Sequence, residues 1–219
     1  MKMLLSLVAN ELRLYQAQRG LSFAFILALS LLGIFRFGIP VDNVSGALLE
    51  IFPAVAYLMA NLQLLLMAIS WESDAYAYRY YAMSGVPLTQ LFFAKTLVTF
   101  IVQVPLWFFC IVGFLLFFPV DAPTMGTTVA LLLTCLPLGA ALAPAGQLIA
   151  AISQHSTQKN FLAIALFLPL CLPVLIAATG RVSAVLAGLD TLRYDALLVA
   201  AALVFLGAGN LLFAYLFEE

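Results

Sequence analysis

Hydrophobic residues along this chain come in long runs that short polar stretches separate. A membrane-spanning helix needs about 20 mostly apolar residues. The third and fourth runs are longer than a bilayer requires, so we expect them to be tilted or broken. The pattern predicts an all-α polytopic membrane protein, with residues 1–219 forming a single transmembrane domain of six helices. The predicted spans are 21–39, 47–70, 92–118, 126–152, 161–179 and 196–217.

Residues 1–19 precede the first run and carry a different pattern. Apolar residues such as Val8 and Leu12 form one stripe on a helix, and Glu11 and Arg13 lie away from its centre. This predicts an amphipathic helix in the headgroup region. The apolar run is too short for a signal peptide, so we expect the segment in the mature protein. It acts either as a simple anchor or as an elbow helix that docks on neighbouring protein.

The longest polar stretch, residues 71–91, lies between the second and third runs. Its first dozen residues lack Gly and Pro and can continue the second helix, before a Gly and a Pro break it. An aromatic belt at the membrane interface explains its Trp and Tyr residues. Mixed charges followed by a turn favour a coupling segment that docks on a soluble partner. The residues expected at that contact are Glu72, Asp74, Arg79, Gly85 and Pro87.

Composition supports the membrane assignment. The 219 residues are 65% hydrophobic and 9% charged, with a mean hydropathy of +1.14, whereas soluble domains are about half apolar and a quarter charged. A net charge of -1 argues against nucleic acid as a partner.

Lysines and arginines in the connections predict the orientation. Six lysines and arginines on the side of the N-terminus against three on the other side favour both termini in the cytoplasm. Charges near helix ends, such as Lys95, are expected to snorkel to the lipid phosphates. The predicted inside residues are Lys2, Arg13, Arg19, Arg79, Lys95 and Lys159, and the predicted outside residues are Arg36, Arg181 and Arg193.

Candidate chemistry inside the spans is sparse. The polar residues there are neutral amides such as Asn61, Gln103 and Gln147, which usually bridge helices at about 1 kcal/mol each; ligand contact is the alternative. Without an acidic relay, ion-coupled transport is disfavoured. No phosphate-binding GxxxxGK[ST] motif or catalytic triad occurs, and the single His155 lies in a polar loop. We therefore expect no catalysis, no metal and no directly bound cofactor, with any ATP on a partner subunit.

Paired prolines mark the fourth and fifth spans. Each removes a backbone hydrogen bond and bends its helix. They serve either as ordinary kinks or as places where these helices flex, or line a lateral surface, during a driven conformational change. Six spans enclose little, so we expect a dimer or hetero-oligomer, with Gly139 and Ala143 as candidate contacts. The prolines are Pro137, Pro144, Pro169 and Pro173.

Several of these features together resemble a known family. The residues concerned are E-L-R at Glu11 to Arg13, a V-P-L turn followed by F-F-A-K before the third span, and L-P-L-x-L-P-V-L-I-A from Leu168 to Ala177. They resemble the CcmB family, the haem exporter protein B that is the membrane subunit of the cytochrome c maturation ABC transporter. The resemblance covers nearly the whole chain. It departs from the family at D-A-Y-A-Y from Asp74, where the family commonly has a glycine.

The resemblance implies an ABC type-2-like permease that transmits ATP-driven conformational change from a separate CcmA-like ATPase. It implies haem export, or release of the haem-loaded CcmE-like chaperone, with haem handled by the complex. Further implied partners are a CcmC-like haem-handling subunit and a CcmD-like small membrane subunit. The alternatives are an ATP-independent scaffold, the permease of another ABC-2 type exporter, and an autonomous carrier or lipid-modifying enzyme.

Overall fold

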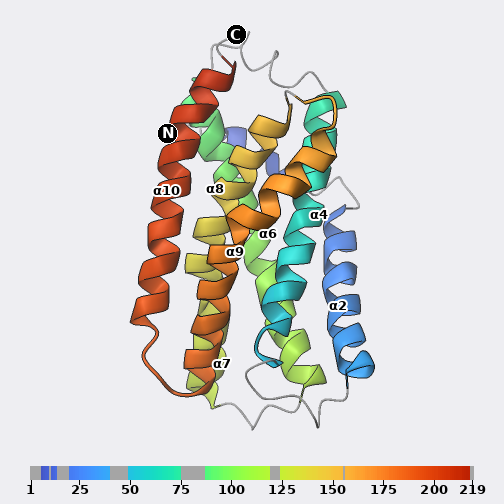
Figure 1. The fold of residues 1–219 in the computed structure, drawn as a ribbon, viewed down its shortest axis with the longest axis vertical. Helices are drawn as coiled ribbons and strands as arrows, with labels where there is room; N and C mark the ends of the chain where they lie inside the picture. The colour runs from blue at the N-terminus through green and yellow to red at the C-terminus, as the bar shows by residue number, and fades with distance from the viewer. Residues whose placement is uncertain are drawn as a thin grey trace.

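The computed structural model describes residues 6–9, 11–13, 20–39, 49–74, 87–118, 124–154 and 156–217. Successive long helices run in alternating directions along one axis (Figure 1). We call the end at which α4 ends and α6 begins the upper end, and the opposite end the lower end. The helices are α2 (Gly20–Gly38), α4 (Phe52–Asp74), α6 (Leu88–Phe117), α7 (Met125–Leu133), α8 (Cys135–Gln154), α9 (Lys159–Leu186) and α10 (Leu192–Phe217). The short helix α7 and α8 run in the same direction and together count as one long helix.

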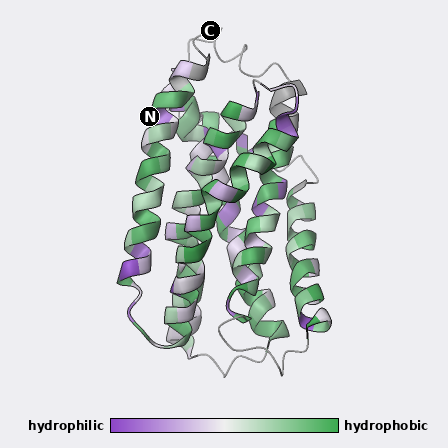
Figure 2. Ribbon diagram, viewed as in Figure 1, coloured by the Kyte–Doolittle hydropathy of each residue, from purple (hydrophilic) through white to green (hydrophobic). Residues whose placement is uncertain are grey.

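The bundle has six candidate membrane spans in its described residues, with α7 and α8 together forming the fourth. Large hydrophobic side chains lie exposed on the outer faces, for example Phe37 on α2, Ile176 on α9 and Leu203 on α10. Figure 2 shows hydrophobic residues along the full length of these helices. Lipid can cover such surfaces, whereas water would penalise them. The prediction of an all-helical, multi-pass membrane protein is confirmed.

Helix α8 lies at the centre of the bundle. Of its 20 residues, 15 are buried, and it packs against α4, α6, α9 and α10. Small side chains permit this approach: a Cβ added at Gly139 would lie 3.1 Å from the Phe100 ring of α6. Gly139 and Ala143 are both buried within the chain. The prediction that these two residues form contacts between subunits is therefore wrong.

The fourth span is broken between α7 and α8, at Thr134. Pro137 lies in the first turn of α8, and its ring nitrogen cannot donate to the carbonyl of Leu133. The Thr134 N–H instead turns back to the Leu131 carbonyl at 3.2 Å, which makes a tighter turn. The expected break thus occurs in the fourth span, whereas the third span is a single helix of 30 residues.

Helix α9 ends at Leu186 instead of at the predicted residue 179. Its end is a Schellman motif, in which Leu189 N–H donates to the Ala184 carbonyl at 2.8 Å. Gly188 takes the left-handed conformation that this motif needs, with φ of 67°. The longer helix brings polar residues that resemble a loop in sequence into the bundle.

Close packing of α10 on α6 gives a test of the fold. A Cβ added at Gly209 would lie 2.2 Å from the Phe92 ring, so Gly209→Ala should lower the free energy of unfolding by about 1–3 kcal/mol. On the same helix, a Cβ at Gly207 would have nothing within 4 Å. Gly207→Ala should leave stability unchanged or raise it by about 1 kcal/mol. Reversible unfolding by SDS in bicelles measures both, and equal losses would contradict the packing.

Candidate functional site

Buried polar residues gather at three levels of the bundle. An ion pair lies near the upper end, neutral amides lie between the ends, and an arginine cluster lies near the lower end. The buried polar or charged residues are Glu11, Asn61, Lys95, Thr96, Gln103, Thr134, Gln147, Ser153 and Arg181.

The N-terminal helix packs against α6. Its described residues 6–9 and 11–13 are helical. Leu7 and Val8 form a buried cluster with Ala94 and Val98 of α6, and Leu12 packs beside them. The apolar stripe expected on this helix therefore packs against α6 of the same chain.

An ion pair reinforces this contact. Lys95 Nζ lies 3.8 Å from Glu11 Oε1, and each side chain is only 4% exposed. Two buried charges are tolerated because each offsets the other, whereas either one alone would cost several kcal/mol. The prediction that Lys95 snorkels to phosphates is wrong, since the chain supplies its counter-charge. Arg13 lies exposed on the same helix.

The coupling segment is described only at its two ends. Glu72 and Asp74 belong to the last turn of α4, which confirms that this helix continues beyond the predicted span. Pro87 precedes α6, and its carbonyl accepts the Gln90 N–H at 2.9 Å. Because α6 begins at Leu88, residues 88–91 belong to that helix and the predicted segment was too long. Arg79, Gly85 and also His155 lie outside the described residues.

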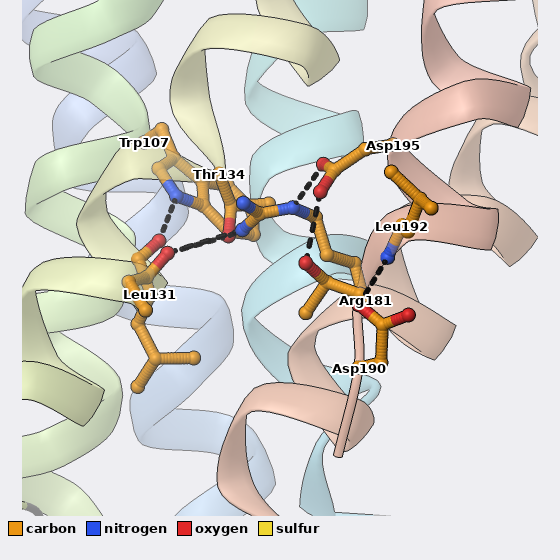
Figure 3. Close-up of polar contacts among 9 residues, drawn as sticks. Trp107, Leu131, Thr134, Arg181, Asp190, Leu192 and Asp195 are labelled. Atoms are coloured by element: carbon orange, nitrogen blue, oxygen red, sulfur yellow. Dashed lines mark hydrogen bonds and ion pairs between the residues drawn. The ribbon is translucent and has the colours of Figure 1, made fainter. Parts of the chain in front are cut away.

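Near the lower end, Arg181 of α9 is buried and binds three groups (Figure 3). Its Nε donates to Asp195 Oδ1 of α10 at 2.5 Å. Its Nη1 donates to the Ala130 carbonyl of α7 at 3.1 Å and to the Thr134 hydroxyl. Asp195 also accepts a hydrogen bond from the Thr191 hydroxyl at 2.9 Å. The prediction that Arg181 belongs to an outside connection is wrong, because it lies within α9.

The break in the fourth span explains what Arg181 binds. Because the Thr134 N–H bonds to Leu131, the Ala130 carbonyl accepts instead from the Thr134 hydroxyl, at 3.2 Å, and from the guanidinium. The Leu131 carbonyl also accepts the Trp107 indole N–H at 3.0 Å (Figure 3). A cation is favoured here, since the carbonyl end of a helix carries partial negative charge. This Arg181 cluster joins α6, α7, α9 and α10.

Between the two ends, Gln147 of α8 donates to the Thr99 hydroxyl of α6 at 2.7 Å. The expectation that an amide bridges helices is confirmed for this residue. Asn61 instead donates to the Tyr57 carbonyl, one turn earlier on α4, at 2.9 Å.

The prolines divide between the core and the outer surface. Pro144 is buried in α8. Pro169 and Pro173 lie exposed on α9, which runs without a break through both of them. The exposed Leu172 and Ile176 continue the same outer face. The two prolines of the fifth span therefore lie on a lateral surface of the described bundle.

The chemistry available in the described part of the chain is that of hydrogen bonds and ion pairs. Its His, Cys, Asp and Glu residues form no group of three or more that could hold a metal ion, and Cys110, Cys135 and Cys171 are buried and free. No protein-family model matches the chain, and no curated protein sequence matches it. The site is thus defined by its geometry: a docked N-terminal helix, a central amide layer and a charged cluster at a helix break.

Removing the lower cation tests the Arg181 cluster. Arg181→Met should lower the free energy of unfolding by about 1–3 kcal/mol, because it removes the hydrogen bonds to Ala130 and Thr134 and takes the cation from the partly exposed carboxylate of Asp195. Arg181→Lys should recover only part of this loss, since one ammonium cannot reproduce the planar set of donors. Arg193, which lies exposed at the same end, is the control, and Arg193→Met should cost about 1 kcal/mol or less. SDS unfolding in bicelles gives the values, and similar losses for both methionine variants would refute the assignment.

A double-mutant cycle tests the upper ion pair. Glu11→Gln and Lys95→Met should each destabilise by about 3 kcal/mol, because each removes the opposite charge that lies 3.8 Å from a side chain only 4% exposed. The double variant should be more stable than the sum of the two losses predicts, by about 1 kcal/mol or more. Arg13→Gln on the exposed side of the same helix should change stability by about 0.5 kcal/mol or less. Strictly additive losses would show that the two charges do not interact.

Proposed function

We propose that this chain is the membrane permease subunit of an ABC-type complex, and that a separate ATPase moves it. The observation that carries the proposal is the buried Glu11–Lys95 ion pair, which fixes the N-terminal helix to the first turns of α6. The predicted coupling segment directly precedes these turns. A partner that displaced the segment would therefore displace α6 and the N-terminal helix together.

The packing offers a path for such a motion. Helix α6 contacts the central helix α8, and the Gln147–Thr99 hydrogen bond links the two helices within the membrane. Helix α8 packs in turn against α9 and α10. Because packed helices move as stiff bodies, a shift at the upper end would reach most of the bundle. The sequence has no phosphate-binding loop of its own, in keeping with ATP on a partner.

We further propose that the complex serves cytochrome c maturation in a bacterial inner membrane, with both termini in the cytoplasm. The motif from Leu168 to Ala177 supports this proposal, since its two prolines lie on the outer face of α9, where another membrane subunit can pack. The partners are then CcmA-like, CcmC-like, CcmD-like and CcmE-like proteins. Haem export or chaperone release is the work that ATP drives, and the complex handles the haem.

Co-purification from native membranes tests the ATPase partner. The full chain should bring down an ATPase that turns over ATP, and a variant with Glu72, Asp74 and Arg79 all changed to Ala should lose most of it. Arg193→Ala, at the opposite end, is the matched control and should retain the ATPase. Retention and normal turnover in the triple variant would contradict the docking assignment.

Deleting the gene, or inactivating the ATPase partner, distinguishes cytochrome c maturation from another exporter and from a scaffold. Staining for covalently bound haem should show loss of c-type cytochromes when the gene is deleted. Intact c-type cytochromes beside a bound ATPase would favour another exporter. A function that survives an ATPase-dead partner would indicate a scaffold.

A further inference from the structure

A small cavity lies between α4, α6 and α8, with Phe167 of α9 closing one side. Its volume is about 20 Å³, which is enough for a single water molecule and too small for a larger ligand. The lining residues are Asn61, Leu64, Leu65, Ala68, Thr99, Gln103, Leu142, Gly146, Gln147 and Phe167.

Three amide side chains that line the cavity have unmet hydrogen-bonding capacity. The carbonyl oxygens of Asn61, Gln103 and Gln147 are buried and have no hydrogen-bond partner among the described residues. The Asn61 and Gln147 nitrogens are already engaged, with Tyr57 and Thr99 respectively. The amide oxygens of Asn61 and Gln147 are therefore the atoms that still need a partner, and an amide oxygen can only accept a hydrogen bond. A buried acceptor without a donor is costly, most of all where lipid excludes water from the surroundings.

Gly146 leaves room beside these amides. It is buried in α8 and lines the cavity, yet a Cβ added there would have nothing within 4 Å. Glycine lowers helix stability relative to alanine. A glycine that packs against nothing therefore keeps a space open at a cost to the helix, and that space opens on the cavity that the three amides also line.

We propose that this cavity is a binding site for one neutral hydrogen-bond donor the size of water, and that a water molecule fills it. Water can donate to two of the three oxygens and thereby bridge helices. A metal cation or ammonium fits less well, because every lining residue is uncharged and a dehydrated cation would have no counter-charge. The site joins the three helices that surround it, and it stands independently of the function proposed above.

Replacing a glycine that lines the cavity by alanine tests whether the cavity holds water. Gly207→Ala adds a methyl group to an exposed helix face and should lower the unfolding equilibrium constant by about fivefold or less, through helix propensity alone. Gly146→Ala adds the same group inside the cavity, displaces the water and leaves the oxygens unpaired. It should raise the unfolding constant by about tenfold. If Gly146→Ala stabilised the protein as much as Gly207→Ala or more, the cavity would be dry and the proposal would fail.

Two further measurements identify the occupant in the wild-type protein. Hydroxyl-radical labelling in the membrane should modify Phe167 and Leu142 beside the cavity, and Gly146→Ala should abolish that labelling while Gly207→Ala leaves it intact. Absence of labelling in the wild type would overturn the proposal. Unfolding in sodium, potassium, ammonium or choline chloride at equal ionic strength should give the same stability, and specific stabilisation by one small cation would show a cation site instead.

Discussion

The guanidinium of Arg181 supplies hydrogen bonds from α9 to the break in the fourth span. In lipid, every backbone polar group must find its partner within the protein. At the break the Thr134 N–H bonds to Leu131, and the Ala130 carbonyl accepts from the Thr134 hydroxyl and from the Arg181 side chain. Asp195 then balances the charge from α10. The cation binds the broken helix and the carboxylate balances the cation, and together they join the C-terminal end of α7 to the lower ends of α9 and α10.

The upper end follows the same rule with different elements. There, Glu11 and Lys95 are hidden from water, and each is the counter-charge of the other. Between the two charged levels, the described interior contains neutral amides, of which Gln147 bridges α8 to α6. Neutral bonds and small residues resist rearrangement less than buried ion pairs do. The described bundle thus has ion pairs near both ends and a layer of neutral amides between them.

The hydrophobic runs sufficed to predict six spans because lipid exposure leaves long apolar segments in any such chain. A break in the fourth span was predicted from its length, but prolines did not give its position, because α6, α8 and α9 run without a break through Pro105, Pro144, Pro169 and Pro173. The partners of Lys95 and Arg181 were not accessible. Local patterns place a charge near a helix end, but the choice between lipid phosphates and a carboxylate depends on residues distant in sequence. Arg181 also led to a prediction that ended α9 too early, because a charged residue among small polar residues resembles a loop in sequence.

The burial of Lys95 and of Arg181 also affects the predicted orientation of the chain in the membrane. The positive-inside rule counts charges that face the lipid headgroups or the aqueous side, so neither Lys95 nor Arg181 belongs in the count. Removing one residue from each side changes six against three into five against two among the nine lysines and arginines of the chain. The excess of positive charge on the side of the N-terminus therefore remains, and the ratio between the two sides is higher. With the upper end thus expected in the cytoplasm, the docked N-terminal helix would lie where a soluble ATPase can reach it, and the Arg181 cluster would lie on the opposite side of the membrane.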